Sequence, residues 1–146
     1  MKIIVLGSGQ VGSSVAAHLA SESRNSVTVV DTDAAVLAEM QEKLDIRTVC
    51  GVASHPSVLE EAGAGDADVL LAVTNSDECN MLACQVAWTL FHTPTKIARV
   101  RSTDYQSHPA LFDNNAVPVD VVPLRREDLE RRGLYELLRA ARGPHG

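Results

Sequence analysis

The sequence predicts an α/β fold in which a doubly wound parallel sheet of six strands is covered by helices on both faces. Short runs rich in β-branched residues alternate along the chain with segments whose apolar residues recur every three or four positions. The first run ends at a glycine motif, G-x-G-x-x-G, which a helical pattern follows. Aromatic residues make up only 3% of the chain, which suits a parallel sheet covered by helices whose packing faces carry small side chains.

The composition is that of one folded domain without membrane spans. A chain of 146 residues can bury a sizeable core. Its apolar runs are far shorter than the roughly 20 residues that cross a bilayer, and its first residues lack a signal-peptide pattern. The net charge of -6 argues against nucleic acid as a partner. Because Cys50, Cys79 and Cys84 lack a C-x-x-C spacing, we expect no zinc site and no disulfides, and a cytoplasmic location.

The glycine motif lies directly after the first expected strand. Gly7 allows a tight turn, Gly9 lets a pyrophosphate approach the backbone, and Gly12 lets the next helix pack close to the strand. The start of that helix offers N–H groups and the positive end of a helix dipole to phosphates. We therefore expect cofactor contacts from six consecutive residues: Gly7, Ser8, Gly9, Gln10, Val11 and Gly12.

The remaining elements continue the alternation of strand and helix. The expected strands are short apolar runs: 26–31, 46–50, 68–73, 96–101 and 117–122. The expected helices lie between them: 34–43, 55–62 and 77–91. Pro118 cannot donate to a strand ladder, so the sixth strand is expected at an edge. The fourth helix, over 77–91, is expected to pack on the core through residues that recur every four positions: Leu82, Val86 and Leu90.

Capping residues support these boundaries. Thr32-Asp33 can cap the second helix, and Pro56 suits the first turn of the third. Gly63 can adopt the left-handed conformation that ends a helix. Asn75-Ser76, followed by the acids Asp77-Glu78, is typical of a helix start.

The pattern changes after Pro123. We therefore divide the chain into a nucleotide-binding domain over 1–123 and a linker with a crossover helix over 124–146. That helix has one apolar face at i, i+3, i+4 and i+7: Leu134, Leu137, Leu138 and Ala141. The face could pack on the parent sheet or on another subunit, and we favour the second because helices already flank the sheet.

Ligands of such sheets bind outside the carboxyl ends of the strands. Besides the glycine motif, the expected strand ends carry an acid, small residues, hydroxyl and amide groups and a cation. The cofactor contacts expected there are Asp31, Thr32, Gly51, Val52, Ala53, Thr74, Asn75, Ser76, Glu78 and Arg101. These residues converge on one edge of the sheet, the rim formed by the carboxyl ends of the strands. This convergence is stronger evidence for a site than the glycine motif alone.

Asp31 lies about 20 residues beyond the glycine motif, where a carboxylate can accept hydrogen bonds from adenosine ribose. A carboxylate would repel a 2′-phosphate, which favours NAD over NADP. Asp31 could instead only cap the following helix. Arg101 could contact phosphates or form a surface ion pair, and the same two alternatives hold for Arg99.

The rim offers no convincing catalytic group. His55 is the only histidine near it, and a residue in that place usually belongs to the start of a helix. Asp77 and Glu78 are adjacent in a first helical turn and point apart, so compensation of the helix dipole explains them better than catalysis. We expect no catalytic residues and no metal ligands.

Several segments together resemble a known family. The phrase T-x-S-D-E-x-N at 74–80 is more specific than the glycine motif. The match extends over nearly the whole chain and includes these segments: 1–12, 29–32, 51–56, 59–64, 72–81, 97–102 and 116–120. The sequence resembles the TrkA N-terminal family, part of the wider RCK (KTN) group of domains that regulate potassium channels and transporters.

The resemblance implies a Rossmann fold that binds NAD(H), or ATP or ADP in the same cleft, without turnover. It also implies a homodimer or higher ring joined through the C-terminal helix. The ring would act on an integral-membrane potassium transporter subunit at the inner face of the plasma membrane. Family contact positions correspond here to Gly7, Gly9, Gly12, Asp31, Thr74, Asn75 and Arg101.

The sequence departs from the family pattern at three points. Many relatives carry an acid after Gly51, whereas Val52-Ala53 stand here, so a contact would be through backbone or apolar atoms. Gln10 stands where some ATP-responding relatives have arginine, which favours NAD. Family members also carry a further regulatory domain, so this chain is either a shortened form or a short natural variant.

We expect a regulatory nucleotide sensor. The competing hypothesis is the cofactor domain of a small NAD-dependent dehydrogenase, and a third is a binding module without a switch. A dehydrogenase needs a substrate site and a proton donor, and the sequence shows neither.

Overall fold

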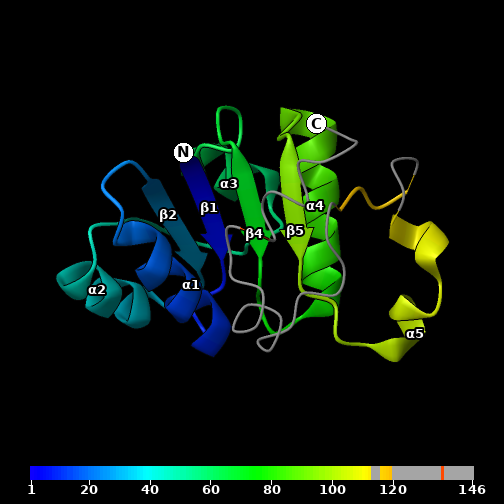
Figure 1. The fold of residues 1–146 in the computed structure, drawn as a ribbon, viewed down its shortest axis with the longest axis horizontal. Helices are drawn as coiled ribbons and strands as arrows, with labels where there is room; N and C mark the ends of the chain where they lie inside the picture. The colour runs from blue at the N-terminus through cyan, green and yellow to red at the C-terminus, as the bar shows by residue number, and fades with distance from the viewer. Residues whose placement is uncertain (113–115, 120–135, 137–146) are drawn as a thin grey trace.

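The computed structural model describes residues 1–112, 116–119 and 136. It has the Rossmann-like α/β fold, with a parallel sheet of five strands in the order β3-β2-β1-β4-β5 (Figure 1). The strands are β1 (Lys2–Leu6), β2 (Ser26–Asp31), β3 (Arg47–Cys50), β4 (Val69–Ala72) and β5 (Thr95–Ala98). The helices are α1 (Gln10–Ala20), α2 (Ala34–Lys43), α3 (Pro56–Ala62), α4 (Asp77–Phe91) and α5 (Thr103–Gln106), and η1 (Pro109–Phe112) is a 3-10 helix.

The fold class is confirmed, but the sixth strand is not. Of the strand expected over 117–122, residues 117–119 are described and have no strand conformation, while 120–122 lie outside the described residues. The linker and crossover helix expected over 124–146 also lie outside them, apart from Glu136. The division of the chain at residue 123 therefore stays a prediction.

The core forms two layers, one on each face of the sheet. In the central strand β1, Ile3 and Val5 pack with residues of α1 and α2, whereas Ile4 and Leu6 pack with residues of α3 and α4. All four side chains are fully buried. This arrangement follows from the two-residue period of a strand whose faces are both covered, and Figure 1 shows α1 and α2 together on one side of the sheet.

Strand pairing brings the loops of the expected site to one edge. Leu6 at the end of β1 pairs with Val30 in β2 and with Ala72 in β4. The residues that follow these strands therefore leave the sheet side by side. The carboxyl ends of the central strands thus form the rim at which the expected contact residues lie.

The turn after β1 requires glycine at two positions. Gly7 has φ +104, and a Cβ there would lie 2.9 Å from the Cα of Thr74. A Cβ at Gly12 would lie only 2.0 Å from the carbonyl oxygen of Gly7. Helix α1 therefore packs against the turn as expected from the sequence. A Cβ at Gly9 would meet no protein atom within 4 Å.

The expected core stripe of α4 was wrong for Leu82 and Leu90, whereas Val86 packs, partly buried, against the core. Leu82 and Leu90 are 54% and 56% exposed, and the buried residues of the helix are Asn80, Ala83, Cys84 and Ala87. Small side chains let the helix lie close to β4 and β5, and the buried amide of Asn80 fixes its rotation through hydrogen bonds to the backbone of Thr74 and Arg99. Leu82 and Leu90 consequently point outward.

Strand β5 is shorter than the expected segment over 96–101, because it ends at Ala98. The carboxylate of Asp77 accepts hydrogen bonds from the backbone N–H groups of Arg101 (3.0 Å) and Ser102 (2.8 Å). These contacts draw the chain toward the start of α4 instead of continuing the strand. Arg101 thus lies three residues beyond the strand end.

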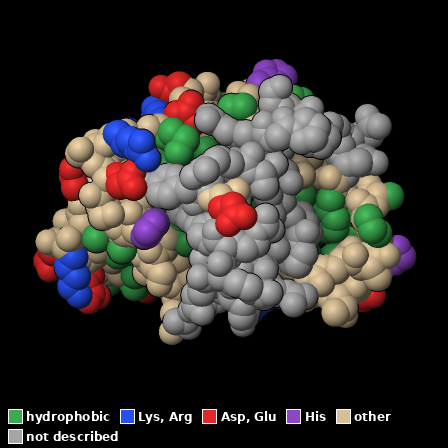
Figure 2. Space-filling view, in the orientation of Figure 1, with side chains coloured by type: hydrophobic (Ala, Val, Ile, Leu, Met, Phe, Trp, Pro, Cys, Tyr) green, Lys and Arg blue, Asp and Glu red, His purple; other side chains and the backbone are tan. Residues whose placement is uncertain are grey.

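The described surface carries charges of both signs. On the face drawn in Figure 2, acidic and basic side chains are interspersed over the part formed by α1 and α2. In the part of the chain that the structure describes, no helix is both long enough and apolar enough to cross a membrane.

Replacing Gly12 with alanine is expected to destabilise the domain by more than about 2 kcal/mol, because the added methyl group would overlap backbone atoms of the turn. Urea denaturation followed by circular dichroism measures this loss. Gly9→Ala is the matched control and should change the free energy of unfolding by less than about 1 kcal/mol. Equal losses in the two variants would contradict the packing account.

Candidate functional site

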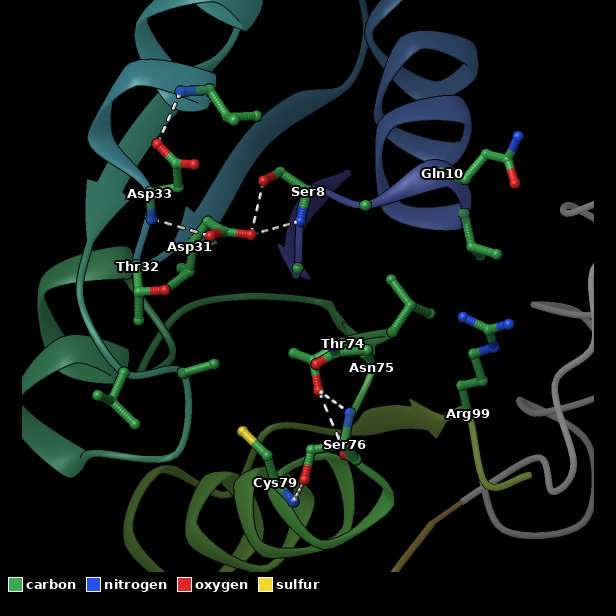
Figure 3. Close-up of a pocket in the computed structure, with 18 of the residues that line it drawn as sticks. Ser8, Gln10, Asp31, Thr32, Asp33, Thr74, Asn75, Ser76, Cys79 and Arg99 are labelled. Atoms are coloured by element: carbon green, nitrogen blue, oxygen red, sulfur yellow. Dashed lines mark hydrogen bonds between the residues drawn. The ribbon is translucent and has the colours of Figure 1, made fainter. Parts of the chain in front are cut away.

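A cleft of about 520 Å³ lies at the carboxyl edge of the sheet (Figure 3). Its walls come from the loops after β1, β2, β3 and β4 and from the start of α4. Thirteen of the sixteen expected contact residues line it: Gly7, Ser8, Gly9, Gln10, Val11, Asp31, Thr32, Gly51, Val52, Ala53, Thr74, Asn75 and Ser76. The structure thus brings together most of the residues that were selected from separate segments of the sequence.

The other three expected contacts lie elsewhere. Gly12 is buried beneath the turn. Glu78 and Arg101 line a neighbouring depression of about 470 Å³. There the Arg101 guanidinium donates a hydrogen bond to the carbonyl oxygen of Asn75 (2.9 Å).

Arg99, for which a phosphate contact and a surface ion pair were both left open, is the arginine that lines the cleft. It directly follows β5, whose early end shifts the rim position from residue 101 to residue 99. In Figure 3, Arg99 lies across the cleft from Asp31. A cation and an acid therefore stand on opposite walls.

Further residues line the cleft without having been predicted: Val30, Asp33, Val36, Val73 and Cys79. Most of them neighbour predicted residues in the sequence. Cys79 reaches the cleft because it lies in the first turn of α4, three residues after the N-cap Ser76. The distance of three residues from the cap could have predicted from the sequence that Cys79 lies near the cleft.

Asp31 is held in place by the turn after β1. Its Oδ2 accepts hydrogen bonds from the N–H (2.8 Å) and the hydroxyl (2.6 Å) of Ser8. Its Oδ1 accepts one from the N–H of Asp33 (2.9 Å). The side chains of Ser8 and Asp31 face one another in Figure 3.

These contacts keep the Asp31 carboxylate ionised. Partial burial acts to raise its pKa, but hydrogen bonds from the Ser8 side chain and from the backbone N–H groups of Asp33 and Ser8 outweigh burial. The pKa of Asp31 is therefore lowered from its ordinary value. The cleft contains a fixed negative charge at neutral pH.

Asp33, not Asp31, caps the second helix. Its Oδ1 accepts hydrogen bonds from the N–H groups of Ala35 (3.1 Å) and Val36 (3.3 Å) at the start of α2. Capping therefore does not account for Asp31, which was the alternative explanation for an acid at that position.

The wall formed by the loop after β4 is organised by a buried amide. Asn80 Oδ1 accepts hydrogen bonds from the N–H (2.9 Å) and the hydroxyl (2.7 Å) of Thr74. Its Nδ2 donates to the carbonyl oxygens of Thr74 (3.1 Å) and Arg99 (2.8 Å). Ser76 accepts from the N–H of Cys79 as the cap of α4. Thr74 and Ser76 thus have structural roles in addition to lining the cleft.

The side chains that line the cleft determine which ligands it suits. Among the described residues that line it there is no histidine or lysine. Within the same described part of the chain, no group of three or more His, Cys, Asp or Glu side chains could hold a metal ion. The groups present are backbone N–H donors, small polar side chains, an ionised carboxylate and a guanidinium, which suit a ligand bearing phosphate and ribose.

Lowering the pH is expected to remove the stability that ionised Asp31 contributes. Because its folded pKa lies below the ordinary value of 3.8, the contribution is fully present above that value and is lost as the pH falls through the folded pKa. Urea unfolding of wild type and Asp31→Asn across the acid range measures it. The difference in unfolding free energy should shrink below about pH 4, and a constant difference would contradict this account.

The fold is shared with solved structures. The TrkA-N domain of the inner membrane protein ybaL from Escherichia coli aligns with a TM-score of 0.67 at 22% identity, covering 94% of this chain and 95% of that chain. The Shewanella denitrificans Kef CTD in AMP-bound form aligns with a TM-score of 0.63 at 19% identity, covering 75% of this chain and 65% of that chain.

Sequence comparison gives a closer match. A protein of Halomonas elongata described as Trk system potassium uptake protein TrkA is 62% identical over 122 residues, which are 84% of this chain. The chain spans only 26% of the length of that protein. The family model of the TrkA-N domain matches residues 3–117. Since this match covers most of the sequence, the chain belongs to the TrkA-N domain family.

Proposed function

We propose that the chain is the nucleotide-sensing domain of a regulatory subunit in a bacterial potassium uptake system. The cleft would bind NAD(H), with ATP or ADP as alternatives in the same site. The observation that carries the proposal is the ionised Asp31 beside the glycine turn, in a chain that is 62% identical over 122 residues to a Trk system potassium uptake protein. The proposed role is regulatory and not enzymatic.

The start of α1 supports phosphate binding. Its N-cap, Gly9, makes no side-chain capping hydrogen bond, and the first turn of the helix has no acidic residue. By contrast, α4 begins with the cap Ser76 and two acids. The N–H groups of α1 are therefore the ones available to an anion, and Arg99 on the opposite wall would add a positive charge.

Asp31 supports the choice of NAD over NADP. An ionised carboxylate accepts hydrogen bonds from ribose hydroxyls and repels a 2′-phosphate. Val52, which is 41% exposed at the cleft, would supply an apolar contact for adenine. Glu78 and Arg101 would reach only a ligand that extends into the neighbouring depression, such as the second half of a dinucleotide.

Binding would act on the assembly of subunits. A nucleotide with different affinities for two subunit arrangements shifts the population toward the arrangement that it prefers. We infer a homodimer or higher ring joined through the segment 124–146. Its partner would be an integral-membrane potassium transporter subunit at the inner face of the plasma membrane.

The alternative, a cofactor domain of a small NAD-dependent dehydrogenase, receives less support. Hydride transfer to or from a hydroxyl requires a group that accepts or donates a proton. The described wall of the cleft offers no histidine, lysine or tyrosine for this task.

Calorimetric titration of the protein with NAD+, NADH, NADP+, ATP and ADP tests the proposal. NAD+ should bind more tightly than NADP+, by about tenfold or more, because of the Asp31 charge. Asp31→Ala should weaken all adenosine ligands. Asp66→Asn, which alters a carboxylate paired with Lys2 at the other end of β1, is the matched control and should leave binding unchanged. Equal affinity for NAD+ and NADP+ would contradict the role of Asp31.

Light scattering tests the assembly. The wild type should run as a dimer or larger ring, and Leu137→Glu should reduce it to a monomer, because a charge would be buried in the proposed apolar interface. A wild-type monomer, or a variant with unchanged mass, would contradict the role of the crossover helix.

A further inference from the structure

The hydrogen bonds of the Asp31 carboxylate are unevenly shared between its two oxygens. Oδ2 accepts two donors, the N–H and the hydroxyl of Ser8. Oδ1 accepts the N–H of Asp33. Each carboxylate oxygen has about two lone-pair positions. Ser8 therefore occupies Oδ2 fully.

This occupancy matters for a sugar. A ribose presents two neighbouring hydroxyls, and a carboxylate can accept one through each oxygen. Here the Ser8 hydroxyl already takes the position on Oδ2 that the second sugar hydroxyl would need. The contact is a short hydrogen bond to an ionised acceptor, which is stronger than one between neutral groups.

Ser8 cannot leave this position by moving its backbone. Its carbonyl oxygen accepts a hydrogen bond from the hydroxyl of Ser13 (2.7 Å). The preceding Gly7 is pressed against the loop after β4, and Gly12 holds α1 against the turn. Only rotation of the Ser8 hydroxyl could open Oδ2, and that rotation would break a hydrogen bond to a charge.

We propose that Ser8 restricts Asp31 to one hydroxyl of a bound ribose, so that residue 8 sets how strongly the cleft discriminates ribose from deoxyribose. The inference rests on the proposed nucleotide function and specifies its sugar selectivity. Ser8 acts here as a positioning residue, because it works through the carboxylate.

The test uses AMP, 2′-deoxy-AMP and 3′-deoxy-AMP as probes in calorimetric titrations. With wild type, removing one of the two hydroxyls should weaken binding about tenfold, and removing the other should have little effect. In Ser8→Ala, the N–H of residue 8 still donates to Oδ2 but one lone-pair position opens. AMP should then bind about three- to tenfold more tightly, and both deoxy analogues should bind more weakly than AMP.

Two variants serve as controls. Ser8→Thr keeps the hydroxyl and should retain the wild-type pattern with the three probes. Ser13→Ala removes the hydrogen bond to the carbonyl oxygen of residue 8 without touching Asp31, and it should also retain that pattern. A general loosening of the turn would change all three affinities by similar factors and would not alter the selectivity between them.

The outcomes separate this inference from the function on which it rests. If wild type already loses affinity with both deoxy analogues, or if Ser8→Ala keeps the one-hydroxyl pattern, the role of Ser8 is overturned while nucleotide binding stands. If AMP binds and Asp31→Asn does not weaken it, the sugar lies elsewhere and the inference again fails alone. If none of the adenosine nucleotides binds the wild type, both the proposed function and the inference about Ser8 are contradicted.

Discussion

The cleft depends on how closely α1 approaches the turn after β1. The space between Gly12 and the carbonyl oxygen of Gly7 is too small for any side chain. This contact sets the course of the turn and with it the direction of the Ser8 N–H, which meets the carboxylate at the end of β2. One backbone constraint thus couples two strands of the sheet and places an ionised Asp31 beside a helix start.

The polar groups around the cleft fall into two classes. Those of the loop after β4 are engaged with each other: Asn80 holds Thr74, and Ser76 caps α4. The start of α1 has no side-chain cap. A rigid wall therefore faces a set of donors that a ligand can use, which lowers the entropy that binding must remove.

The order of elements and the rim could be predicted because both follow from local signals. The period of apolar residues identifies strands, and glycines mark the turn whose geometry requires them. The buried side of α4 and the end of β5 could not. They are set by Asn80 and Asp77, whose partners lie far along the chain in the segment around Arg99 and Arg101. The expected rim cation was consequently placed two residues too late.

The two edge strands of the five-stranded sheet differ in exposure. Strands β3 and β5 have four residues each, but β3 begins with the exposed cation Arg47, whereas every residue of β5 is buried and the ammonium of Lys96 donates hydrogen bonds to the carbonyl oxygens of Thr93 and Pro94. A short edge strand that carries an exposed charge discourages the backbone pairing by which open sheets extend into aggregates. Copies of this domain that associate would consequently avoid pairing through β3, so contacts between them can be remodelled without disturbing the hydrogen-bonded ladder on that side of the cleft.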